Sequence, residues 1–194
     1  MQERKFTRRE VVEKLLAGLA AGAAWPLVAS AHPIHEHLRN AALLDRADDA
    51  DRAGAWKPLF LNAKQNETLV ELAEAMVPGS TKAQVNRFID LLLSVDTVEH
   101  QKQFLESLGA VENEAEKCFG RGVRAISERE RETLLTGISQ IESQRPHFEN
   151  LKEWVVGAYY SSEQGMRELA WDGKHAFAKF PGCEDADVAH QHGA

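Results

Sequence analysis

Three histidines near residue 35 form the most obvious group of potential metal ligands in this sequence. His32, His35 and His37 share one short stretch, and His190 and His192 lie near the C-terminal end. Imidazole nitrogens are good ligands for zinc and copper. The spacing matches no closed metal motif, however, and two solvated tails that contain histidine would look the same. We therefore expect no metal site. A stand-alone module that binds ligands or handles metals through these histidine-rich ends is one candidate function.

Residues for nucleophilic or redox chemistry are few. Ser161, Ser162 and Glu163 adjoin one another, but no histidine follows nearby to act as a base. The sequence has no glycine-rich dinucleotide motif, no Cys-x-x-Cys-His haem motif and no cysteine cluster for an iron–sulfur centre. We expect no catalytic residue and no cofactor in this chain, which is then not an enzyme on its own. A small enzyme with an unrecognised site in its helical core is a weaker option.

The two cysteines, Cys118 and Cys183, leave several states open. In an oxidising compartment an even pair can form a disulfide. In a reducing compartment they would instead be small buried apolar residues. Cys183, close to the terminus, could also be free or contact a partner.

Apolar residues recur with helical spacing along the middle of the chain, and no stretch alternates with a period of two. Capping boxes are expected at Asn62 and at Ser127, each with a Gln or Glu three residues later. Gly109 is expected to break or kink a helix, and Arg145-Pro146 to end one. Ser161 or Ser162 would cap a short turn. The fold class is therefore all-α, a small bundle of five or six helices with irregular N- and C-terminal tails.

The N-terminal stretch has the features of an export signal. Arg8 and Arg9 adjoin in a basic region, an apolar run follows, and Ala29 and Ala31 form a small-residue cleavage signature. The paired arginines resemble the twin-arginine export signal. Residues 1–31 are thus predicted to be a twin-arginine-type signal peptide rather than part of the fold. The alternative is an ordinary amphipathic helix. Gly18 and Gly22 make this alternative less favourable, because each glycine inside a helix costs about 1 kcal/mol.

The remaining chain divides by composition. We expect a polar, flexible segment over residues 32–58, a helical domain over 59–183 and a flexible tail over 184–194. The net charge of −7, with a basic N-terminal stretch, leaves an acidic body that disfavours nucleic acid as a partner. A signal peptide in front of such a body predicts a periplasmic protein.

Aromatic residues gather late in the chain, where the helical periodicity fades. Tyr159, Tyr160, Trp171 and Phe180, together with Glu163, are our candidates for a partner interface. Aromatic side chains with a polar group suit surfaces that are apolar on one side and wet on the other. Each of them could equally seal the core of the bundle itself.

Several blocks of sequence, in this order, resemble one known family. They are Phe60-Leu61-Asn62-x-x-Gln65, Val77-Pro78-Gly79, Phe88-Ile89-Asp90, Tyr160-Ser161-Ser162-Glu163-x-Gly165 and Phe180-Pro181-Gly182-Cys183. Over roughly residues 59–183 the chain is similar to the gluconate 2-dehydrogenase subunit 3 family, the small or gamma subunits of bacterial flavoprotein dehydrogenases. The element after Pro78-Gly79 is shorter here than is usual in that family.

The resemblance implies an accessory role. Such a subunit binds, matures and co-exports a catalytic flavoprotein of the glucose–methanol–choline (GMC) type, which oxidises sugars, sugar acids or polyols. It further implies FAD in that partner, an iron–sulfur cluster as a further cofactor there, and haem in a c-type cytochrome subunit. The twin-arginine translocase would be a transient partner. The complex would be periplasmic and associated with the membrane.

Overall fold

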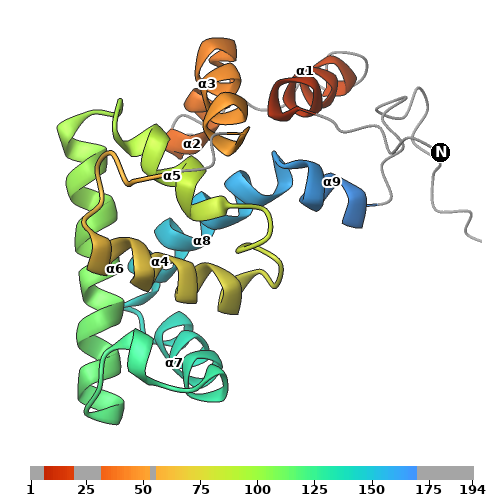
Figure 1. The fold of residues 1–194 in the computed structure, drawn as a ribbon. Helices are drawn as coiled ribbons and strands as arrows, with labels where there is room; N and C mark the ends of the chain where they lie inside the picture. The colour runs from red at the N-terminus through yellow and green to blue at the C-terminus, as the bar shows by residue number, and fades with distance from the viewer. Residues whose placement is uncertain (1–6, 20–31, 53–55, 170–194) are drawn as a thin grey trace, which may run out of the picture.

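The computed structural model describes residues 7–19, 32–52 and 56–169, and within these ranges every regular element is a helix (Figure 1). The all-α prediction is confirmed. In the same ranges no helix is long and apolar enough to cross a membrane. The elements are α1 (Arg8–Leu19), α2 (Pro33–His37), α3 (Ala41–Arg52), α4 (Ala63–Met76), α5 (Val85–Leu93), α6 (Val98–Phe119), η1 (Val123–Ala125), α7 (Glu128–Gln140), α8 (Arg145–Tyr160) and α9 (Glu163–Glu168).

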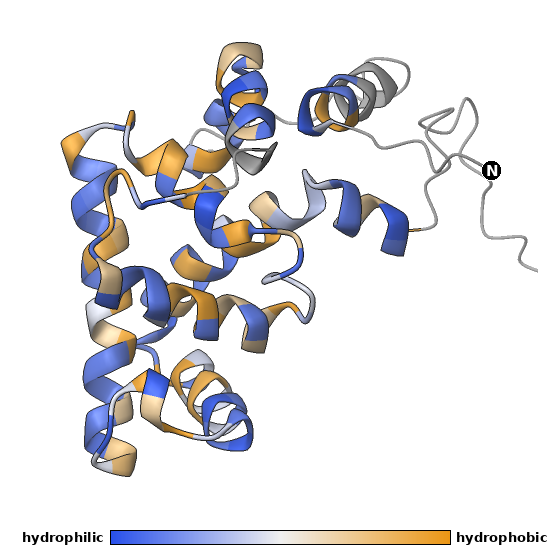
Figure 2. Cartoon of the chain, viewed as in Figure 1, coloured by the Kyte–Doolittle hydropathy of each residue, from blue (hydrophilic) through white to orange (hydrophobic). Residues whose placement is uncertain are grey.

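Helix α8 is the centre of the fold, since α2, α4, α5, α6, α7 and α9 all contact it. Its inward face carries Leu151, Trp154, Val155 and Ala158, which recur at helical spacing and are all buried. Trp154 meets Phe104 of α6 edge to face at 5.9 Å between ring centroids. Apolar positions turn inward on the surrounding helices as well (Figure 2). Each large buried side chain contributes about 1.5–3 kcal/mol, so α8 holds the bundle together.

The predicted caps form as expected. The side chain of Asn62 accepts a hydrogen bond from the amide of Gln65, and the side chain of Gln65 bonds back to the amide of Asn62. Ser127 and Glu130 make the same reciprocal pair at the start of α7. Ser162 caps α9, as one of the two serines predicted to do so. These caps fix where α4, α7 and α9 begin.

Two predicted helix ends differ from the structure. Gly109 lies inside α6, which runs unbroken for 22 residues. Burial of Phe104, Leu108 and Val111 along one face of α6 outweighs the cost of about 1 kcal/mol for a glycine. Pro146 begins α8 instead of ending α7, because proline in the first turn loses no helical hydrogen bond.

Asp90 joins the stretch before α4 to helix α5. Its carboxylate is completely buried and accepts hydrogen bonds from the amides of Leu59, Phe60 and Leu61 at 2.6, 3.1 and 2.8 Å. A carboxylate is stabilised in such a place because each amide dipole points toward it. The Phe60-Leu61 and Ile89-Asp90 blocks of the sequence are therefore in direct contact.

The region before residue 56 differs from the expected flexible segment. Helices α2 and α3 lie there, with Ile34, Leu43 and Leu44 buried. Ile34 packs over Gly157 of α8, where an added Cβ would lie 2.8 Å from Ile34 Cδ1. A glycine at this point thus makes the notch that α2 fills. Helix α1 lies beside α3 and contacts α9 (Figure 1).

Candidate functional site

Arg8 occupies a pocket in the folded body. Its side chain is buried, although it was predicted to belong to a signal outside the fold. Nη1 donates to the carbonyl oxygen of Ala158 at 2.9 Å and to Ser161 Oγ at 3.3 Å, and Nη2 donates to the carbonyl oxygen of Ala83 at 2.9 Å. The guanidinium also lies over the ring of Phe88, 4.3 Å from its centroid. We call this the guanidinium pocket, formed by Ala83, Phe88, Ala158 and Ser161.

The walls of the guanidinium pocket come from two turns that are distant in sequence. One is the stretch 77–84 between α4 and α5, and the other is the junction between α8 and α9. The carboxylate of Glu74 holds the first turn by accepting from the amides of Gly79 and Thr81 at 2.8 and 2.7 Å. Burial acts to raise the pKa of Glu74, but these two amides outweigh it and hold the pKa below its usual value.

The second turn depends on a close backbone approach at Gly165. A Cβ at this position would collide with the carbonyl group of Tyr159, so α9 can fold back against α8 only with glycine here. Ser162 stabilises the same turn by accepting from the amide of Gly165 at 3.1 Å. The serines and the glycine of the Ser161-Ser162-Glu163-x-Gly165 block therefore have structural roles in building the pocket.

The electrostatics of the guanidinium pocket suit a cation. The Ala158 carbonyl lies in the last turn of α8, where the helix dipole presents negative partial charge. The face of the Phe88 ring adds a cation–π interaction. A planar guanidinium can reach acceptors on both turns at once, which the single ammonium of lysine cannot. The geometry of the pocket therefore suits arginine better than lysine.

Arg9 has the opposite environment. Its side chain is 44% exposed and forms ion pairs with Glu13 at 2.7 Å and with Asp45 of α3 at 2.9 Å. The hydrogen bond that Arg9 donates to Glu13, followed by the charge of Asp45, raises the pKa of Arg9. One arginine of the predicted signal is hidden and the next is exposed. The spacing of Arg8, Val11 and Val12 on one helical face is the sequence signal that could have revealed this, since all three are buried.

The neighbouring histidines His32 and His37 contact different side chains. His32 Nε2 bonds to Asn150 Oδ1 at 2.8 Å, and burial lowers the pKa of His32 although the bond to Asn150 acts in the opposite direction. His100 Nδ1 makes a hydrogen bond with Asp96 Oδ1 at 2.7 Å, and His37 Nε2 lies 2.9 Å from Asp96 Oδ2. Burial acts to raise the pKa of Asp96, and the two histidines outweigh it and lower the pKa. No group of three His, Cys, Asp or Glu side chains in the described ranges could hold a metal ion.

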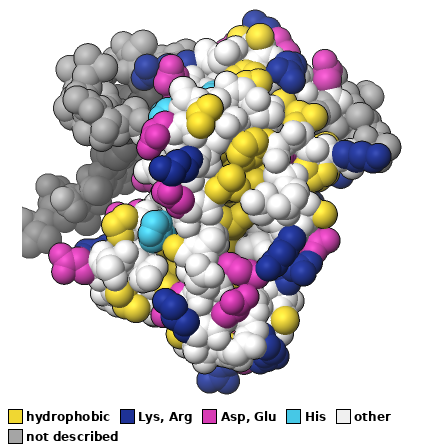
Figure 3. Space-filling model, turned by 90° about the vertical axis from the view of Figure 1, so that its left-hand side faces the viewer, with side chains coloured by type: hydrophobic (Ala, Val, Ile, Leu, Met, Phe, Trp, Pro, Cys, Tyr) yellow, Lys and Arg dark blue, Asp and Glu magenta, His cyan; other side chains and the backbone are white. Residues whose placement is uncertain are grey.

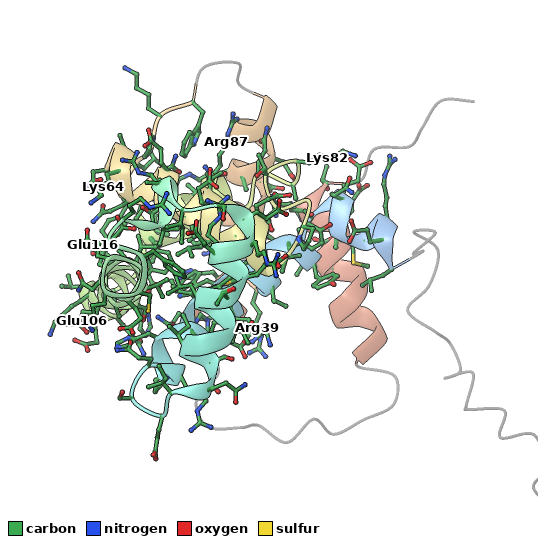
Figure 4. The ribbon with its side chains drawn as sticks, turned by 90° about the horizontal axis from the view of Figure 1, so that it is seen from below. Arg39, Lys64, Lys82, Arg87, Glu106 and Glu116 are labelled. Carbon is green, nitrogen blue, oxygen red and sulfur yellow. The ribbon has the colours of Figure 1, made fainter. Side chains whose placement is uncertain are left out.

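A serine–histidine contact that the sequence did not reveal joins Ser107 Oγ to His147 Nδ1 at 3.3 Å. Ser107 is buried, donates to the carbonyl of Gln103 and accepts from Asn150 at 2.9 Å. A hydroxyl already bonded in this way and closed to substrate is a packing element rather than a nucleophile. Glu106 and Glu116 on α6, which are labelled in Figure 4, are exposed on the outside of the body.

Two shallow hollows lie on the described surface. One, of about 330 Å³, lies between α4, α7 and α8 and includes Met76, Leu135 and Phe148 in its lining. The other, of about 220 Å³, lies between α4 and α6 and includes Leu105 and Glu112. On the face that carries α6, apolar side chains gather in a central band with charged side chains around it (Figure 3). This surface suits contact with another protein more than enclosure of a small substrate.

A protein-family model, described as gluconate 2-dehydrogenase subunit 3, matches residues 63–182, which is well over half of the chain. The chain belongs to the gluconate 2-dehydrogenase subunit 3 family. The resemblance inferred from the sequence is confirmed, and the family's description is that of one subunit of a dehydrogenase complex. No curated protein and no solved structure matches the chain significantly.

The subunit 3 match covers the residues of the guanidinium pocket but not the arginine bound in it. Ala83, Phe88, Ala158 and Ser161 all lie within residues 63–182, whereas Arg8 lies outside them. The family domain therefore supplies the acceptors, and the N-terminal extension supplies the cation.

The partner-interface candidates of this subunit 3 chain fall into three groups. Tyr159 is completely buried and meets Tyr160 edge to face at 5.2 Å, so it seals the chain's own core and is wrong as an interface residue. Tyr160 and Glu163 are half-buried, and Glu163 pairs with Arg167 at 2.7 Å. Trp171 and Phe180 lie outside the described residues.

The remaining predicted sites stay predictions. Cys118 is exposed near the end of α6, and Cys183 lies outside the described residues, so their pairing is untested. Ala29 and Ala31, the predicted cleavage signature, also lie outside them.

Proposed function

We propose that this chain is the non-catalytic small subunit of an FAD-dependent dehydrogenase of the GMC type, which acts on sugars, sugar acids or polyols. It binds the catalytic flavoprotein in the cytoplasm, supports its maturation and brings it through the twin-arginine translocase into the periplasm. A c-type cytochrome subunit receives the electrons there.

One observation carries this proposal. A domain of the subunit 3 family follows a segment in which Arg8 and Arg9 precede an apolar run. A flavoprotein acquires FAD when it folds, so it must be exported folded. If it lacks a signal of its own, it can cross only while bound to a subunit that has one. Such a contact needs roughly 1,200–2,000 Å² of buried surface.

Co-expression with a GMC-type flavoprotein that lacks an export signal of its own tests the proposal. Replacement of both Arg8 and Arg9 by lysine keeps the charge but removes the paired guanidinium groups. We expect flavoprotein activity in the periplasmic fraction to fall to background, while the flavoprotein remains in the cytoplasm.

The matched control replaces two exposed arginines of the body, Arg124 and Arg129, by lysine. These changes make the same replacement of arginine by lysine outside the signal, and they should leave the periplasmic activity of the flavoprotein unchanged. Normal periplasmic activity in the Arg8→Lys/Arg9→Lys variant would overturn the escort function. Turnover of a sugar by the purified chain alone would overturn the non-catalytic role.

A further inference from the structure

The guanidinium pocket and the export machinery compete for the same residue. Arg8 is only 3% exposed in the folded chain, and its acceptors belong to the body of the protein. A receptor that reads two adjacent arginines needs both side chains accessible. Docked Arg8 and receptor-bound Arg8 are therefore mutually exclusive states of the leader.

We propose that the guanidinium pocket is a binding site for the chain's own leader, which withholds the leader from the translocase while Arg8 is docked. This inference rests on the proposed export function, because it assigns a regulatory step to the same segment. The ligand class is an arginine guanidinium carried on a basic amphipathic helix. The site itself is the pair of turns around Ala83 and Ala158, with the ring of Phe88.

Several contacts show that the docked state is built rather than accidental. The amide of Arg8 donates to Asp48 Oδ1 of α3 at 3.0 Å, which orients the first turn of α1. Val11 and Val12 are buried on the same face of the helix as Arg8. Arg9 pairs with Asp45 of α3. The leader helix is thus held by a cation site, a short apolar face and the ion pair between Arg9 and Asp45 of the neighbouring helix.

The same contacts make the docked state reversible. Of the α1 side chains that the structure describes, Arg8, Val11 and Val12 are buried. Helix α1 contacts α3 and α9 at the edge of the fold, and such a peripheral element opens at a lower free energy than a core such as the bundle around α8. The leader can therefore leave the pocket while the family domain stays folded.

Hydrogen exchange of the full-length chain tests docking without any export. Arg8→Lys removes the planar fork that spans the two turns, and Arg9→Lys is the matched control on an exposed neighbour. We expect the amides of Val11 and Val12 to exchange about tenfold faster in Arg8→Lys than in the wild type, and within about twofold of wild type in Arg9→Lys. Equal exchange in all three proteins would overturn the docking site.

Export kinetics then test the withholding. Asp48→Ala weakens the docked helix but leaves the leader sequence intact, and Glu36→Ala, at an exposed position of α2, is its control. Pulse-chase fractionation should show Asp48→Ala leaving the cytoplasm about threefold faster than wild type, because the undocked population rises. The free energy of unfolding of both variants is measured as a check that they fold. If Asp48→Ala does not fold, Ser161→Ala serves as the second variant, because it removes one side-chain acceptor of Arg8.

The outcomes separate the two proposals. A variant whose leader opens faster by hydrogen exchange, but which is exported at the wild-type rate, overturns the withholding and leaves the escort function standing. A wild-type chain that never leaves the cytoplasm with its flavoprotein overturns the escort function and the withholding together, while the exchange data still decide whether the pocket binds Arg8.

Discussion

Helices α1 and α2 both attach the N-terminal region to α8, but by different physical means. Helix α2 places Ile34, which is completely buried, into the notch over Gly157, and His32 bonds to Asn150 beside it. Helix α1 reaches the end of α8 through the guanidinium of Arg8 and adds Val11 and Val12. The first attachment depends on shape, and the second depends mainly on one cation.

The difference shows which part of the N-terminal region belongs to the permanent fold. A side chain fitted into a backbone notch on the central helix cannot leave without opening the core. A guanidinium bonded to carbonyl oxygens can exchange them for water at a modest net cost. We therefore expect α2 to unfold with the bundle and α1 to open by itself.

The largest effect is expected at Ile34. Ile34→Ala should lower the free energy of unfolding by about 2–4 kcal/mol, since it removes a buried side chain and leaves the Gly157 notch empty. Urea denaturation followed by circular dichroism measures it, with Glu36→Ala as an exposed control within about 0.5 kcal/mol of wild type. A loss below about 1 kcal/mol would place α2 with α1 as a loosely attached helix.

The notch itself gives the next effect. Gly157→Ala should cost about 1–3 kcal/mol, because the new Cβ would lie 2.8 Å from Ile34 Cδ1. In the Ile34→Ala background the same change should cost much less, since the obstructing atoms are gone. Denaturation of the two single variants and the double variant completes the cycle. Additive costs would mean that Ile34 does not fill this notch.

A smaller effect is expected on the side of α1. Val12→Ala should lower the global free energy of unfolding by less than about 1 kcal/mol, because α1 opens before the bundle and its contacts are already lost there. The same variant should speed exchange of the Val11 amide. A global cost as large as that of Ile34→Ala would show that the two helices unfold as one unit.

The smallest effect concerns pH. Burial lowers the pKa of His32, so the folded state favours the neutral ring, and its stabilisation is present above the ordinary value of 6.5 and is lost as pH falls. The difference in unfolding free energy between wild type and His32→Gln should therefore become smaller from neutral to mildly acidic pH, by up to about 1 kcal/mol. A difference that is constant with pH would exclude a neutral His32 as the anchor of α2.

Local signals made most of the helical body predictable. The capping boxes at Asn62 and Ser127 and the apolar spacing of α8 are encoded within a few residues of one another. The prediction of a break or kink at Gly109 is wrong because tertiary burial overrides the intrinsic preference of one residue. The prediction that Arg145-Pro146 ends a helix is wrong because proline is disfavoured in the middle of a helix but suits its first turn.

The guanidinium pocket could not be predicted in the same way. It joins residue 8 to acceptors more than 70 positions away in sequence, and two of them are backbone carbonyls that no residue type reveals. Asp90 is a similar case, since its partners are the amides of residues 59–61. The sequence predicts Tyr159 at an interface although it lies in the core, because an aromatic residue looks the same in sequence whether it seals a core or faces a partner.

The covalent link between α1 and α2 gives the docked leader a further property. Residues 20–31 tether Arg8 to a body on which α2 is firmly anchored, so the pocket meets its ligand at a high effective concentration. A peptidase cut within this tether would turn an intramolecular contact into a bimolecular one and dilute the ligand away. Proteolysis would then make the release of the leader irreversible, because the empty guanidinium pocket could no longer rebind Arg8.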